Sequence, residues 1–378
     1  MLHEEVSTGS RTRRTLGGAA RVLLALKVDG PLLTGLGLVA AFGLVVLYSA
    51  SSENSPMLLR TVLRLALGAV IMLALARVNP NVLRRASPWL YAVGILLLLA
   101  VAAIGHVYLG AKRWLDLGPV QFQPSELMKL AVPMMCAWYL HERPLPPRWS
   151  DLAVLSAIIL MPVALVAKEP DLGTAMLIGA GGFTVVFLAG LRKRVIVTLL
   201  LLAVAGMLFG MRFMHGYQRE RLVSYLNPEA HPLGAGYHII QSQIAIGSGG
   251  VFGKGWMAGS QALLDFLPER TTDFIFSVIG EEFGLLGVLG LLLLYAFIIG
   301  RSLYLSMQGP DTFSRLLGGS VALTFFIYVF INAGMTTGLV PVVGVPLPLV
   351  SYGGSSVVTV LSGFGILMSL YSHRKLMG

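Results

Sequence analysis

Charged side chains in this chain stand at the ends of long apolar runs, where an ionised group is costly to bury and is therefore a functional candidate. A carboxylate in such a place can take a proton from a hydroxyl or hold a divalent cation. Fixed cations can stabilise an anion. The candidate carboxylates and cations are Lys112, Arg113, Glu126, Lys129, Asp171, Arg219, Arg221, Lys254, Arg270 and Asp273.

Two of the carboxylates also have a plain structural interpretation. Asp273 precedes an apolar run, and Asp171 follows a proline, so either side chain could simply begin a helix. Glu126 and Lys129 are three residues apart, so on a helix they share one face and could neutralise each other. These alternatives remain open at the level of sequence.

The cations have a similar alternative. Lys112 and Arg113 stand beside Trp114, and this cluster could be an anchor at the membrane interface. Arg60 and Arg64 fall inside an apolar run, where they could snorkel outward or line a cavity.

Several other chemistries find no support in the sequence. The polar segment 351–356 contains no G-x-S-x-G elbow and has no plausible histidine partner, which argues against a serine hydrolase. The segment could be only a turn with a helix cap. Cys136 is the single cysteine, so no internal disulfide can form. No basic stripe with interleaved aromatic residues is present, and we expect no nucleic-acid partner.

The composition requires lipid as the solvent. Of the 378 residues, 56% are apolar and only 12% are charged, and the mean hydropathy is +0.78. A soluble domain usually carries about a quarter charged residues. The net charge of +10 comes from cations scattered in short loops, which is typical of the topology signal of membrane proteins.

A membrane-spanning helix needs about 20 mostly apolar residues, and by this rule the chain has about ten. We predict an all-α polytopic membrane protein with a single transmembrane domain over residues 31–372, a cytoplasmic segment 1–30 and a cytoplasmic tail 373–378. The run at 31–50 lacks a cleavage site and is read as a retained first helix. The predicted spans are 31–50, 58–76, 88–108, 124–141, 151–167, 171–190, 194–212, 273–299, 316–337 and 354–372.

The orientation follows from the basic residues. With the N-terminus inside, about 17 of the 28 Lys and Arg residues lie in inside segments, so both termini are predicted to be cytoplasmic. The long segment 213–272 then lies outside. It is rich in aromatic residues and has apolar runs, and we expect it to fold back onto the membrane surface with short interfacial helices. The candidate site residues also gather on the outer side.

The longer strings in these outer segments resemble the SEDS family (shape, elongation, division and sporulation), and most of all its RodA branch. The resemblance covers nearly the whole chain. Thr271 is a departure, because relatives often have histidine there. The strings that carry the resemblance are Gly110–Gly118, Gln123–Lys129, Glu169–Ala175, Gly236–Gln243, Gly253–Gly255, Phe266–Phe276, Met335–Pro341 and Pro346–Ser356.

The resemblance implies a peptidoglycan glycosyltransferase that polymerises lipid II into glycan strands at the outer face of the cytoplasmic (inner) membrane, during cell elongation and the maintenance of rod shape. Asp273 matches the essential catalytic aspartate of the family. The implied partners are lipid II, the nascent glycan strand, a class B penicillin-binding protein that crosslinks the strands, and other membrane proteins of the elongation complex.

The chemistry of this reaction gives the other candidates their roles. We expect Asp273 to act as a general base, or alternatively to hold a divalent cation such as Mg²⁺ or Mn²⁺ against the diphosphate. Ser355, in the last outer turn, is a further candidate for substrate binding. Glu126, Lys129 and Asp171 are expected in the wall of the cavity. The expected cations for the diphosphate are Lys112, Arg113, Arg219, Arg221, Lys254 and Arg270.

Two other functions compete with this one. A lipid II flippase or other transporter predicts polar residues through both halves of the membrane, whereas the carboxylates here are skewed to the outer side. A noncatalytic scaffold for cell-wall synthases predicts that Asp273 tolerates replacement.

Overall fold

The protein is described by a computed structural model over residues 28–104, 106–108, 111–116, 121–169, 171–198, 201, 235–264, 266–267 and 269–373. Within these ranges it is largely helical, and six of the helices are long and apolar enough to cross a membrane. Apolar helices with no exposed backbone groups are the element that a bilayer requires. The chain is therefore a polytopic membrane protein, as predicted.

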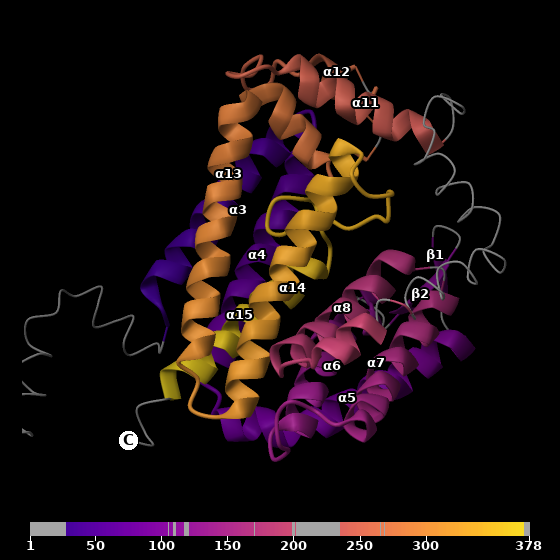
Figure 1. The fold of residues 1–378 in the computed structure, drawn as a ribbon. Coiled ribbons are helices and arrows are strands. Elements are labelled where there is room, and N and C mark those ends of the chain that lie inside the picture. The colour runs from indigo at the N-terminus through magenta and orange to yellow at the C-terminus, as the bar shows by residue number, and fades with distance from the viewer. Residues whose placement is uncertain are drawn as a thin grey trace, which may run out of the picture.

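Nine of the predicted spans correspond to helices in the described part of the chain (Figure 1). The seventh predicted span, 194–212, falls mostly outside the described residues, so the total of about ten stays a prediction. The nine helices are α3 (Gly30–Ala50), α4 (Ser55–Ala76), α5 (Pro80–Ile104), α6 (Pro124–Leu140), α7 (Trp149–Lys168), α8 (Leu172–Leu188), α13 (Ile275–Met307), α14 (Thr312–Thr337) and α15 (Ser356–Ser372).

The structure corrects the third predicted span, 88–108. Helix α5 begins earlier and ends at Ile104, and the next residues form strand β1 (His106–Tyr108). This strand pairs antiparallel with β2 (Ala111–Asp116), which pairs antiparallel with β3 (Gln121–Phe122). A glycine after Ile104 has low helix propensity, and valine and tyrosine favour strands. The predicted all-α class holds, but the prediction did not include this small sheet.

Two further helices lie in the segment that was predicted as the long outer loop. They are α11 (Ala235–Ser248) and α12 (Ser260–Leu263). Figure 1 shows them across one end of the bundle, opposite the end at which α13 connects to α14. We refer to this as the α11 end.

Helix α13 is broken near the α11 end, at Gly284, whose backbone has φ 64° and ψ −162°. The turn that follows α11 fits into the break, because Leu285 N donates to Gly250 O at 3.0 Å and Leu286 N donates to Val251 O at 3.1 Å. A Cβ at Gly284 would overlap the backbone nitrogen of Gly253, so only glycine fits here. The residues before the break, 275–283, form a short arm that we call the α13 arm.

Candidate active site

The first part of the site is a buried ion pair on α6. Lys129 Nζ lies 2.7 Å from Glu126 Oε1, and the two side chains are only 5% and 8% exposed. The ammonium group also lies 5.6 Å from the ring centroid of Tyr328 on α14. The predicted neutralising pair therefore forms. A buried ion pair gives little net stability, whereas either charge buried without the other is strongly destabilising.

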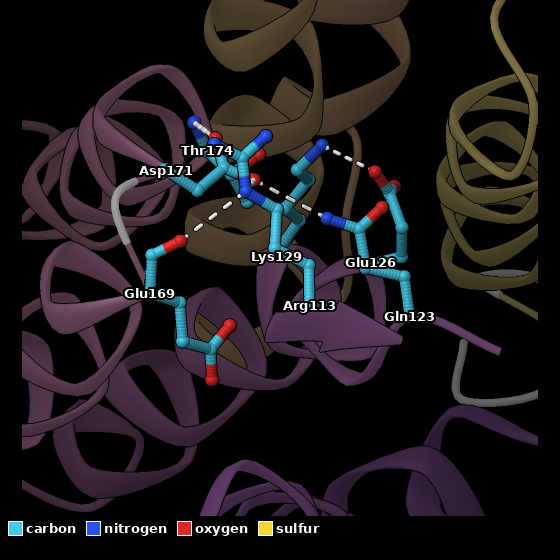
Figure 2. A network of polar contacts seen from close by, with 7 residues as sticks. All are labelled: Arg113, Gln123, Glu126, Lys129, Glu169, Asp171 and Thr174. Atoms are coloured by element: carbon cyan, nitrogen blue, oxygen red, sulfur yellow. Dashed lines mark hydrogen bonds and ion pairs between the residues drawn. The ribbon is translucent and has the colours of Figure 1, made fainter. Parts of the chain in front are cut away.

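The second part of the site is the turn into α8, shown with the ion pair in Figure 2. Asp171 is the N-cap residue of α8, because its Oδ1 accepts from Thr174 N at 3.2 Å. The predicted helix start is thus confirmed. The other carboxylate oxygen, Oδ2, accepts from Gln123 Nε2 at 3.3 Å and lies 3.9 Å from Arg113 Nε. Arg113 Nε also donates to the backbone oxygen of Glu169 at 3.2 Å.

Glu169 is the third element, and the sequence prediction did not include it among the site residues. Glu169 is only 6% exposed, and its side chain points away from Arg113 (Figure 2). Burial, and then the neighbouring Asp171 carboxylate, raises the pKa of Glu169 to about 7, while Arg113 opposes this shift. In the sequence, Glu169 could have been recognised as a site residue because it stands in the string Glu-Pro-Asp that ends at Asp171.

Asp273 stands one residue before Phe274, the N-cap residue of α13, which makes no side-chain cap hydrogen bond. The backbone oxygen of Asp273 accepts from Asn332 Nδ2 of α14 at 2.9 Å. The same amide donates to Val345 O at 2.7 Å, and Asn332 is fully buried. Asn332 therefore ties the loop that carries Asp273 to the turn before α15. In the sequence, Asn332 could have been recognised as a lone amide side chain inside an apolar run.

Glycines bring Asp273 and Asp171 to the same region. A Cβ built on Gly344 would lie 3.3 Å from Asp273 Oδ2, and Gly344 has a φ of 72°. A Cβ on Gly173, in the first turn of α8, would overlap the backbone oxygen of Val343. The segment 343–344 thus lies between Asp273 and the helix turn that Asp171 begins.

Besides Lys129 and Arg113, two more of the candidate cations are engaged by protein groups. Lys254 Nζ lies 2.7 Å from Oε1 of Glu281, a residue that is fully buried. Arg270 donates to Ala50 O at 2.7 Å and to Ser52 Oγ at 3.1 Å, at the C-terminal end of α3. Both contacts hold connecting segments to the bundle.

For the remaining candidates, the structure gives the element on which two of them lie. Lys112 lies in β2, where its backbone pairs with Val107 of β1. Ser355 is the N-cap residue of α15, and its side chain makes no cap hydrogen bond. Arg219 and Arg221 lie outside the described residues.

Arg64 does not behave as a lipid-facing arginine. Its guanidinium carbon lies 4.9 Å from the ring centroid of Tyr352, in the turn before α15. Of the two sequence alternatives for this residue, the inward orientation is the one observed. No group of three His, Cys, Asp or Glu side chains within the described residues is arranged to hold a metal ion.

Fold and site together define a multi-pass membrane protein with buried charged residues among its helices. The chain matches the model of the family described as cell cycle protein (FtsW, RodA and SpoVE) over residues 30–376. This chain belongs to that family. It is 48% identical to the peptidoglycan glycosyltransferase MrdB of Escherichia coli K12 over 351 residues, which covers 93% of this chain and 95% of the relative.

More distant comparisons agree with this assignment. The chain is 39% identical to MrdB of Helicobacter pylori J99 over 78% of both chains. It matches a chain of a solved peptidoglycan synthase complex, which coordinates polymerization and crosslinking, with a TM-score of 0.80 and 36% identity over 92% of this chain and 98% of the other. It matches the crystal structure of Thermus thermophilus RodA with a TM-score of 0.69 and 32% identity, over 92% and 97% of the two chains. The fold is therefore that of RodA.

Proposed function

We propose that this chain is a peptidoglycan glycosyltransferase that polymerises lipid II, with Asp273 as its general base. The position of Asp273 supports this most directly. Its carboxylate lies against Gly344, and the neighbouring Val343 packs against Gly173 in the first turn of α8. Asp171, the N-cap residue of that helix, is in turn contacted by Gln123 and Arg113.

The reaction that fits this arrangement is the attack of a sugar hydroxyl on an anomeric carbon. The hydroxyl of the acceptor forms the new glycosidic bond, and the bond from the donor sugar to the lipid diphosphate breaks. A hydroxyl is a poor nucleophile, so a carboxylate within hydrogen-bond reach accelerates the step by taking its proton. The carboxylate of Asp273 takes this proton, and the diphosphate leaves with the bonding electrons.

The leaving diphosphate needs positive charge, and Arg113 is the best-supported candidate. Its side chain is 34% exposed and stands beside Asp171 at the edge of the network. Fixed cations directed at developing charge are a large catalytic contribution. Lys112, Arg219 and Arg221 remain proposed diphosphate ligands, and Ser355 a proposed substrate contact. Lys254 and Arg270 make shorter contacts, of 2.7 Å each, to Glu281 and to Ala50 O, whereas Arg113 lies 3.9 Å from Asp171. This makes Lys254 and Arg270 weaker candidates.

The Glu126–Lys129 pair and Asp171 form the wall of the proposed site. A narrow cavity of about 50 Å³ runs from Lys129 and Tyr328 between α6, α14 and α15. This volume holds a few water molecules, and a disaccharide is far larger.

The same chemistry sets the orientation and the partners. Lipid II is elongated outside the cytoplasmic membrane, so the α11 end faces outward and both termini are cytoplasmic. The solved synthase complex supports a class B penicillin-binding protein as the crosslinking partner, acting with other elongation proteins during rod-shaped growth.

The decisive experiment is lipid II polymerisation by the purified protein together with its penicillin-binding partner. The natural sequence is compared with Asp273→Asn, after both have been shown to fold and to bind the partner equally. Glycan from the natural protein alone supports the proposal. Glycan from both proteins would exclude Asp273 as the base and favour an ordinary structural role, and glycan from neither would favour transport or scaffolding.

A second role for Asp273 is to hold a divalent cation against the diphosphate. The ion would then draw its other ligands from the diphosphate oxygens, because such oxygens suit Mg²⁺. Polymerisation measured across a chelator titration separates the two roles. Activity that persists in excess chelator supports the base, and activity that is lost and returns with Mg²⁺ or Mn²⁺ supports the cation.

A further inference from the structure

The α13 arm, residues 275–283, is held by the carboxylate of Glu281, which has no part in the reaction described above. Glu281 is fully buried, and its Oε1 accepts three contacts from one connecting segment. Lys254 Nζ lies at 2.7 Å, Gln261 N at 3.0 Å and Ser260 Oγ at 3.1 Å. One carboxylate oxygen therefore gathers the segment 254–261 onto the arm.

Backbone contacts join the same two parts of the chain. Lys254 N donates to Glu281 O at 3.0 Å, and Gly255 N donates to Glu282 O at 3.0 Å. Nearer the start of the arm, Ser277 Oγ lies 2.5 Å from Ser242 Oγ of α11. The arm is thus held laterally by α11 and the segment that follows it.

This lateral attachment matters because the rest of α13 does not fix the arm. The helix is broken at Gly284, so the arm is separated from the long membrane-spanning part of α13. Its other face is held by α3, where Ser49 Oγ donates to Glu282 Oε1. Asp273 stands two residues before the arm begins, so the position of the arm, together with the Asn332 contact, bears on where the Asp273 carboxylate lies.

We propose that the Lys254–Glu281 ion pair is a positioning device that sets the location of Asp273, and that Lys254 does not bind the diphosphate. This inference rests on the proposed role of Asp273 as the base. The pair acts through the arm and touches no reacting atom, so Lys254 and Glu281 are positioning residues. A misplacement of about 1 Å in a catalytic group can lower the rate roughly 100-fold.

The test is a kinetic double-mutant cycle on the complex with the partner, using Lys254→Met, Glu281→Gln and the two changes combined. We expect each single variant to lower kcat by about 10- to 100-fold and to leave the KM for lipid II unchanged. The double variant should be no worse than the poorer single variant, because both changes break one interaction. Lys254→Arg should retain most of the activity, since it keeps the charge.

A diphosphate ligand would behave differently. A rise in KM for Lys254→Met with normal kinetics for Glu281→Gln would overturn the proposal, and so would additive losses in the double variant. Unchanged kinetics in all three variants would also overturn it. If Lys254→Met fails to fold, because it leaves Glu281 buried without its cation, Glu281→Gln and Lys254→Arg still decide the matter.

Two reference variants keep the outcomes separate. Glu142→Gln changes an exposed carboxylate that follows α6 at the opposite end of the bundle, and it should leave kcat and KM as they are. Asp273→Asn tests the proposed function itself. Activity in Asp273→Asn would refute the base and this inference together, whereas an inactive Asp273→Asn with an altered KM in Lys254→Met would refute the inference alone.

Discussion

The side-chain amide of Asn332 in α14 donates a 2.9 Å hydrogen bond to the backbone oxygen of Asp273, which stands in the turn before α13. The amide is fully buried and makes a second contact to Val345 O at 2.7 Å. The position of the proposed base is therefore fixed through its backbone.

This relationship predicts that Asn332→Ala lowers both stability and rate. Two carbonyl oxygens lose a donor, and for the buried Val345 oxygen this costs about 1–3 kcal/mol of unfolding free energy. We expect kcat to fall at least 10-fold, measured by lipid II polymerisation alongside thermal unfolding. Phe326→Ala, on an exposed face of the same helix, is the control and should leave kcat unchanged. Equal activity in the two variants would argue that the amide does not position Asp273.

The Glu126–Lys129 pair makes a prediction about stability as distinct from activity. Lys129→Met leaves a buried carboxylate without its cation and should cost about 3–5 kcal/mol, whereas Glu126→Gln combined with Lys129→Met should recover most of that loss. We expect the double variant to be well folded and still inactive, as judged by unfolding and polymerisation assays. A folded and active double variant would assign the pair to folding alone.

Glu169 should make stability depend on pH. Its folded pKa of about 7 lies above the ordinary value of 4.5, so the folded protein binds the proton more tightly than the unfolded chain. The stabilising contribution is complete below the unfolded pKa and is lost as pH rises through about 7, by at most a few kcal/mol. Glu169→Gln should remove this loss, so its advantage in thermal unfolding should grow between pH 5 and pH 8. A constant difference across this range would contradict the shift.

Gly344 should not tolerate a side chain. Its φ of 72° disfavours any L-residue, and a Cβ would lie 3.3 Å from Asp273 Oδ2. Gly344→Ala is therefore expected to cost about 1–2 kcal/mol of stability and to reduce kcat more than it raises KM. Gly354→Ala is the matched control, because no atom lies within 4 Å of the Cβ it would add. Similar kinetics in both alanine variants would show that the space beside Asp273 is not critical.

Much of the fold was predictable because the bilayer imposes a simple rule on sequence. Long apolar runs must be helices, and nine of the predicted spans match helices to within a few residues at most of their ends. The rule fails where the chain leaves the bilayer, and so it missed the strand His106–Tyr108. It also missed the break at Gly284, because the apolar pattern continues through it and the lost hydrogen bonds are replaced by a segment distant in the sequence.

For the site, the sequence by itself determined which residue types are present: Asp273, Asp171 and the Glu126–Lys129 pair stand out because charge is costly in an apolar chain. Only the tertiary structure decided which of them meet. Lys254 and Arg270 look like Arg113 in the sequence, yet the fold directs the first two to Glu281 and to α3, and the third to Asp171. The reason is physical: hydrophobicity is carried by each residue alone, whereas the partner of a charge depends on contacts between segments that lie far apart along the chain.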